Sequence, residues 1–156
     1  MSRPIVYITR EIPENGIKIL KNEFEVRVNN KNKDLTKKEI ISEAKDASAL
    51  ITMLSNTIDS EVMDQLNQLQ VVANYAVGYN NIDIEAATER GIAVTNTPDV
   101  LTETTADLTW ALILSAARRI VESDKYVRQN KFSGWSPKLF LGRDVYDKTL
   151  GIIGMG

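Results

Sequence analysis

Short hydrophobic runs alternate with amphipathic segments along the first part of the chain. Runs rich in aliphatic and β-branched residues predict strands, and they lie at residues 5–9, 24–28, 49–52, 71–76 and 92–95. The run at 5–9 is continuous, which is typical of a strand covered on both faces of a parallel sheet. The run at 24–28 alternates apolar and polar residues and indicates a half-exposed edge strand.

Helix-start signals occupy the segments between these strands. Proline suits the first turn of a helix, and Thr or Asp side chains accept hydrogen bonds from its free N–H groups. The predicted starts are Pro13, the capping box of Thr36 and Glu39, Asp59, and a helix from Asp83 to Arg90 that stops at Gly91. Strands that alternate with helices in this way predict an α/β fold, with a doubly wound, flavodoxin-like parallel sheet.

The alternation ends after Pro98. A helical segment is predicted over roughly Thr102–Arg128, and it is apolar on nearly every side between Ala106 and Ala117. Such a helix must be covered on more than one side, so we expect it to bridge domains or subunits. A loop rich in aromatic and turn residues follows at 132–137, and a last strand is predicted to begin near Thr149.

Composition excludes several classes of function. Nineteen Lys and Arg residues against 21 Asp and Glu give a net charge of −2, which argues against a nucleic-acid-binding surface. The sequence contains no cysteine and no histidine, so we expect no disulfide, no thiol nucleophile and no metal site. The start of the chain has no apolar signal region, and no apolar run is long enough to span a membrane. We therefore expect a cytoplasmic protein without membrane contact.

The loop from Ala76 to Asp83 leaves the carboxyl end of the fourth predicted strand, where doubly wound sheets bind ligands. Gly78 permits a close approach of backbone to a ligand, and successive N–H groups in such a turn can hold a carboxylate. A glycine turn followed by an Asp-capped helix explains the same residues, and composition alone favours this second interpretation.

The last six residues, 151–156, resemble a short buried strand that enters a Gly-x-Gly turn at Gly154 and Gly156. A complete dinucleotide-binding signature also has a third glycine, a helix and an acidic residue about 20 positions later. We therefore expect that this stretch does not form a complete dinucleotide site by itself, and a Gly-x-Gly alone is weak evidence for such a site.

Four segments carry a close resemblance to a known family: residues 7–13, 73–83, 94–102 and 141–146. They resemble the NAD(P)-dependent D-2-hydroxyacid dehydrogenases, and within them the glyoxylate/hydroxypyruvate reductases. The resemblance covers the whole chain but only the first half of such an enzyme. It implies two domains with the substrate between them: residues 1–98 as the substrate-binding domain, 99–148 as an interdomain and dimerisation helix with its loop, and 149–156 as the start of the nucleotide-binding domain.

The resemblance also implies roles for individual residues. Backbone N–H groups of Val77 and Gly78 would bind the substrate carboxylate, and Leu54 would form an apolar wall beside it. Trp135 would reach the site of a neighbouring subunit. The implied cofactor positions are Val100 and Thr105 along the nicotinamide, with Gly154 and Gly156 in the phosphate-binding turn. Asn80 stands where an aspartate is usual, and it serves the same turn chemistry.

The implied activity is hydride transfer from NADH or NADPH to a 2-oxo acid, such as glyoxylate or hydroxypyruvate, in a homodimer. No residue of the chain matches the Arg, Glu and His of the family's mechanism, so no catalytic residue is assigned here. We expect the 156 residues to be inactive and to bind the cofactor weakly when alone.

A non-catalytic binding or dimerisation module derived from the family is the alternative. A receiver domain is excluded, because Thr9-Arg10 and Thr52-Met53 stand where it needs carboxylates. The choice between NAD and NADP stays open.

Overall fold

A computed structural model describes residues 3–154 of the chain. These residues form two compact units that divide between Val100 and Leu101, and each unit is described by itself. Across the described part, no helix has both the length and the apolar character that a membrane crossing requires.

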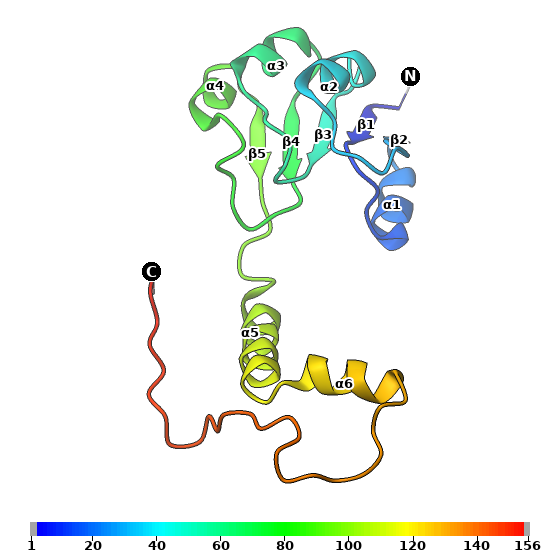
Figure 1. Cartoon of the computed structure of the whole chain (residues 1–156). Helices are drawn as coiled ribbons and strands as arrows, with labels where there is room; N and C mark the ends of the chain where they lie inside the picture. Colours follow the sequence, from blue (N-terminus) through cyan, green and yellow to red (C-terminus); the bar gives the residue numbers. More distant parts are fainter. Residues whose placement is uncertain (1–2, 155–156) are drawn as a thin grey trace. The chain divides into compact units, whose positions relative to one another are not determined.

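The first unit is built on a parallel sheet of five strands in the order β2-β1-β3-β4-β5 (Figure 1). This is the flavodoxin-like order predicted from the alternation of strands and helices. Strand β2 lies at one edge, as its alternating sequence predicts, and β5 lies at the other. The strands are β1 (Ile5–Ile8), β2 (Glu25–Val28), β3 (Ala49–Thr52), β4 (Val71–Asn74) and β5 (Ala93–Thr95).

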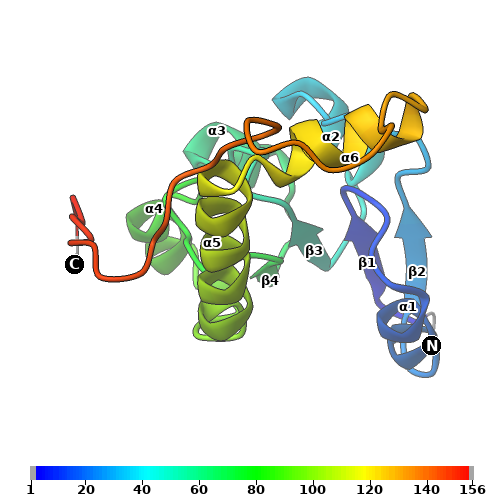
Figure 2. The same cartoon turned by 60° about the horizontal axis from the view of Figure 1, so that its bottom comes forward.

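Four helices connect these strands: α1 (Glu14–Lys21), α2 (Lys37–Glu43), α3 (Ser60–Gln65) and α4 (Ile84–Glu89). Right-handed crossovers place α1 on one face of the sheet and α2, α3 and α4 on the other (Figures 1 and 2). The core lies under the latter three helices, where Ile40, Leu50, Ile58, Val62 and Val72 are fully buried.

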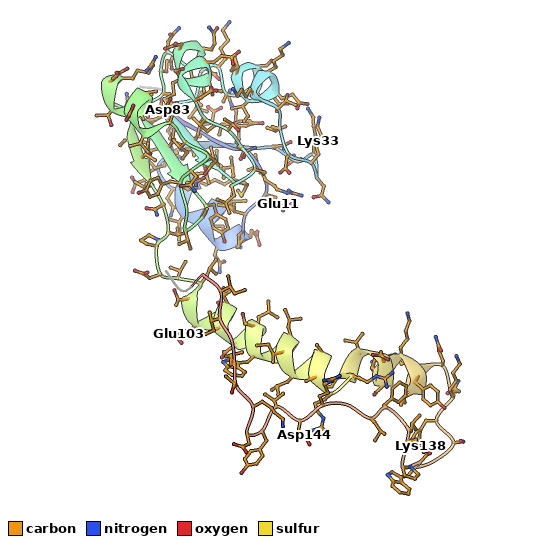
Figure 3. The ribbon with its side chains drawn as sticks, turned by 60° about the vertical axis from the view of Figure 1, so that its left-hand side comes forward. Glu11, Lys33, Asp83, Glu103, Lys138 and Asp144 are labelled. Carbon is orange, nitrogen blue, oxygen red and sulfur yellow. The ribbon has the colours of Figure 1, made fainter. Side chains whose placement is uncertain are left out.

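The predicted caps are present. Thr36 and Glu39 form the capping box of α2, in which the Glu39 carboxylate accepts the Thr36 N–H at 3.0 Å. A hydrogen bond from Lys33, together with those from Thr36, lowers the pKa of Glu39 to about 2. Asp83 accepts the N–H of Ala86 at 2.9 Å and so fixes where α4 begins, directly after the loop that contains Gly78 (Figure 3).

The second unit contains α5 (Thr102–Ala117) and α6 (Ile120–Arg128). The single helix predicted over 102–128 is therefore wrong, because the chain turns at Arg119, whose φ is 54°. A later segment explains the break: the Arg143 N–H donates to the Ala117 carbonyl at 2.7 Å, and this bond replaces one that would continue the helix. Gly142 is required there, since a Cβ at this position would lie 2.6 Å from the Ala117 oxygen.

Helix α5 has no buried residue in the chain by itself. Its exposed apolar side chains include Leu108, Trp110, Leu112 and Leu114. The strand predicted to begin near Thr149 is also not formed over residues 149–154. A strand requires a neighbouring strand for its backbone hydrogen bonds, and the described residues of this unit provide none.

Candidate functional site

Three buried polar residues end neighbouring strands of the sheet: Thr9 after β1, Thr52 at the end of β3 and Asn74 at the end of β4. The Thr52 hydroxyl donates to Asn74 Oδ1 at 2.9 Å, and the Thr9 hydroxyl donates to Asn56 Oδ1 at 2.6 Å. Buried polar groups are destabilising unless they are hydrogen-bonded, so these bonds fix the strand ends against each other.

Asn81 joins the loop after β3 to the loop after β4. Its Nδ2 donates to the carbonyl oxygens of Asn56 at 2.9 Å and Met53 at 3.2 Å. An isolated parallel bridge between Ile58 and Ile82 ties the same two segments together. The two loops therefore lie side by side at the carboxyl edge of the sheet, where doubly wound folds bind ligands.

In the loop after β4, three successive carbonyl groups are bound from within the unit. The Ala76 carbonyl accepts the Thr97 N–H at 2.9 Å, and the Val77 carbonyl accepts Asn96 Nδ2 at 2.7 Å. The Gly78 carbonyl accepts Asn74 Nδ2 at 2.8 Å. Hydrogen bonds to its carbonyl oxygens thus fix the conformation of the loop.

The N–H groups of this loop consequently face away from those contacts. In a trans peptide the C=O and the N–H point in opposite directions, and the described chain has no cis peptide. The N–H groups of Val77 and Gly78 therefore point away from the 96–97 segment, and the structure shows no acceptor for either among residues 3–154. Two adjacent free donors on one side of a loop can bind a carboxylate or another anion.

Gly78 leaves the space in front of these donors open. Its φ lies outside the left-handed region, and a Cβ built on it would meet no atom within 4 Å. The fold of the chain therefore does not require a glycine at this position. Apolar side chains stand on the same two loops, since Leu54 is 61% exposed and Val77 is 43% exposed. The edge of the sheet thus offers free N–H donors together with exposed apolar side chains.

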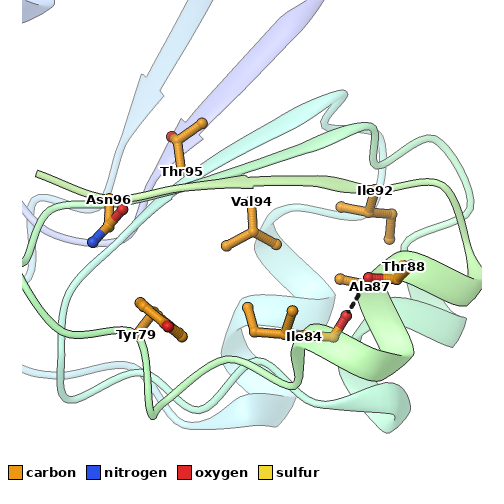
Figure 4. A pocket seen from close by; sticks show the side chains of 8 residues that line it. All are labelled: Tyr79, Ile84, Ala87, Thr88, Ile92, Val94, Thr95 and Asn96. Carbon is orange, nitrogen blue, oxygen red and sulfur yellow. Dashed lines mark hydrogen bonds between the residues drawn. The ribbon is translucent and has the colours of Figure 1, made fainter.

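A groove of about 340 Å³ lies between α4 and the edge strand β5 (Figure 4). Ile84, Ala87, Ile92 and Val94 give it an apolar lining, and Asn96 borders it. Because the Asn96 amide binds the Val77 carbonyl, the Gly78 N–H is directed away from that side chain. The groove and the free donors are therefore separate features of this unit.

The sequence profile of the D-isomer specific 2-hydroxyacid dehydrogenases, catalytic domain, matches residues 6–146. The chain belongs to this family.

Glyoxylate reductases are among the relatives to which this chain is similar. It is 53% identical to the glyoxylate reductase of Thermococcus kodakarensis and 55% identical to that of Pyrococcus horikoshii, and each match covers 99% of this chain. The match covers 47% of either relative, so the chain spans about half the length of the relatives it matches.

Solved dehydrogenase structures have the same fold. A D-isomer specific 2-hydroxyacid dehydrogenase from Polaromonas matches with a TM-score of 0.92 at 35% identity, over 99% of this chain and 49% of that one. An NADPH-dependent glyoxylate/hydroxypyruvate reductase from Sinorhizobium meliloti, in complex with NADP and malonate, matches with a TM-score of 0.76 at 29% identity, over 99% of this chain and 47% of that one.

Of the substrate-binding residues predicted by resemblance to the dehydrogenases, Leu54, Val77 and Gly78 lie on the two joined loops of the first unit. Trp135 belongs to the second unit and is 84% exposed. It borders a hollow with Tyr126 and Phe140, whose rings meet edge to face at 5.1 Å.

The predicted cofactor residues are divided between the two units. Val100 is 64% exposed at the end of the first unit, and Thr105 is exposed on α5 in the second. Gly154, the last described residue, has a φ of 74°, and Gly156 lies outside the described residues. Residues 3–154 also contain no cluster of acidic side chains suited to a metal ion.

Four asparagines that shape the site were not predicted from the sequence: Asn56, Asn74, Asn81 and Asn96. A signal was present, because Asn74 ends an apolar strand and Asn96 directly follows another. Their partners could not be found in this way, since Asn81 and Met53 are 28 positions apart.

We expect Asn81→Ala to destabilise the chain by about 1–3 kcal/mol, because the carbonyls of Met53 and Asn56 lose their donor. Asn80→Ala is the matched control, since Asn80 is the exposed neighbour. Urea unfolding of both variants measures the difference. Equal stability of the two variants would contradict the linking role of Asn81.

Proposed function

We propose that these residues form the substrate-binding part of an enzyme that reduces glyoxylate or hydroxypyruvate to a D-2-hydroxy acid with NADH or NADPH. The observation that carries this proposal is the pair of free N–H groups at Val77 and Gly78. The carbonyl groups of the same two peptide bonds accept hydrogen bonds from within the fold. The identity of more than 50% with glyoxylate reductases of two archaea supports the choice of substrate.

In the proposed complex, the substrate carboxylate accepts hydrogen bonds from the N–H groups of Val77 and Gly78. Charge-assisted hydrogen bonds of this kind are shorter and stronger than neutral ones. The reacting C2 carbonyl of a 2-oxo acid is bonded directly to the carboxylate carbon, so fixing the carboxylate also places the carbonyl. Leu54 would cover the apolar side of the substrate and limit the access of water. We assign binding and orientation to this chain, and no proton transfer.

The remaining predicted residues belong to the same proposal. By resemblance to the family, Val100 and Thr105 would lie along the nicotinamide, and Gly154 with Gly156 would begin the pyrophosphate-binding turn. A homodimer built on α5 would cover the exposed Leu108, Leu112 and Leu114, and Trp135 would approach the partner's substrate site. A cytoplasmic location stays a prediction from the sequence.

The complete product of the reading frame that encodes these residues tests the proposal. We expect it to oxidise NADH or NADPH when glyoxylate or hydroxypyruvate is added, and to form a D-2-hydroxy acid. The Gly78→Val variant should raise the KM for glyoxylate about tenfold or more, because its side chain enters the open space before the donors. A product that binds neither 2-oxo acid nor nucleotide, and only self-associates, would contradict the proposal and support the non-catalytic alternative.

A further inference from the structure

We infer that Asn96 is a positioning residue, whose side-chain amide keeps the Gly78 N–H aimed at the substrate carboxylate. This inference rests on the proposed function and deepens it. Asn96 itself touches no substrate in this arrangement. It acts through the peptide bond between Val77 and Gly78, which carries both the carbonyl that Asn96 binds and the N–H that is free.

The geometry of Asn96 suits this role. It directly follows strand β5, and its neighbour Thr97 donates its N–H to the Ala76 carbonyl at 2.9 Å. The backbone at 96–97 is therefore fixed against the loop, and the short bond of 2.7 Å from Asn96 Nδ2 to the Val77 carbonyl adds a second link. Residue Asn96 is half-buried, but the hydrogen bond itself lies in exposed surroundings, so its short length and the fixed backbone at 96–97 rather than burial favour it.

A specific alternative conformation makes this restraint necessary. The peptide between Val77 and Gly78 can rotate as a unit if ψ of residue 77 and φ of residue 78 change together. Glycine tolerates the positive φ that such a rotation produces, whereas other residues resist it. Rotation would turn the Val77 carbonyl oxygen toward the carboxylate, and the two would repel each other.

Other contacts of the loop do not prevent that rotation. Thr97 restrains the peptide before Val77, and Asn74 restrains the peptide after Gly78. Among residues 3–154, the structure shows only Asn96 as a donor to the carbonyl of the peptide between them. Gly78 leaves space for the substrate, and the hydrogen bond from Asn96 restrains the peptide rotation that a glycine at this position permits.

The test uses the 156-residue chain and sodium glyoxylate as the probe, followed by amide NMR, with sodium chloride at equal ionic strength as the reference. In the unsubstituted chain, we expect the Val77 and Gly78 amide signals to shift with saturation below about 100 mM. In Asn96→Ala, the apparent Kd should weaken about tenfold, and the Gly78 signal should broaden from exchange between two peptide orientations.

Asn67→Ala is the matched control, because Asn67 is exposed in the turn after α3, outside the substrate loops. It should bind glyoxylate as the unsubstituted chain does. Unchanged core amide signals in Asn96→Ala would show that the fold is kept. Equal glyoxylate affinity in Asn96→Ala and Asn67→Ala would overturn the inference, as would the absence of a Val77 or Gly78 shift in the unsubstituted chain.

The outcome is separable from that of the proposed reaction. If the complete gene product reduces glyoxylate but Asn96→Ala binds it normally, the positioning role fails and the reaction stands. If the Val77 and Gly78 signals respond as expected but no 2-oxo acid is reduced, the reaction fails and the carboxylate site with its Asn96 restraint stands.

Discussion

A polypeptide of these 156 residues alone is expected to leave NADH and NADPH unoxidised in the presence of glyoxylate. The described residues offer donors for a carboxylate, and the sequence contains only the first two glycines of the dinucleotide-binding signature, Gly154 and Gly156. Positioning two reactants against each other corresponds to an effective concentration of roughly 10⁵–10⁸ M. A positioned acid or base raises the reaction rate about 10²–10⁴-fold. The sequence also has no histidine to act as that acid.

A fusion provides the positive control for this prediction. The chain matches 47% of the Pyrococcus horikoshii glyoxylate reductase at 55% identity, so a fusion can be designed in which it stands in place of the matching part of that enzyme. We expect the fusion to oxidise NADH or NADPH with glyoxylate. Activity that follows the unfused 156-residue polypeptide through successive purification steps would contradict the prediction.

The second large effect concerns assembly through α5. Leu108 and Leu112 are 60% and 61% exposed and lie one helical turn apart. Burying one such side chain is worth about 1.5–3 kcal/mol, and a two-fold axis doubles each contribution. We therefore expect the double variant Leu108→Asp with Leu112→Asp to weaken the proposed homodimer at least a hundredfold, on the order of 3 kcal/mol or more.

Light scattering after size-exclusion chromatography measures this change at tens of micromolar protein. Ile19→Asp is the matched control, because Ile19 is 70% exposed on α1 and lies outside the second unit. The control should remain dimeric. A stable monomer for the unsubstituted chain would refute the proposed dimer and remove the basis for a cross-subunit role of Trp135.

Local signals explain why the fold of the first unit was predictable. Thr36 and Glu39 lie three positions apart and cap their own helix, and Asp59 and Asp83 act over the same short range. Strand positions follow from apolar runs because the sheet is buried under α2, α3 and α4. Each of these features depends on residues close together in the sequence.

Features that depend on distant residues were not predictable. The break between α5 and α6 requires Arg143 and Gly142, which lie more than one helix length away in sequence. The position of Val77 and Gly78 in the site was implied by family resemblance, but the orientation of their N–H groups depends on Asn74 and Asn96. No sequence pattern states which carbonyl an asparagine amide will bind.

A crystal structure of the complete gene product with oxamate, a non-reactive analogue of a 2-oxo acid, tests the central claim most directly. The carboxylate should lie about 2.9 Å from the backbone nitrogens of Val77 and Gly78, with the Val77 carbonyl still bound to Asn96. A carboxylate bound elsewhere, with both N–H groups left free or turned inward, would contradict the proposed role of this loop.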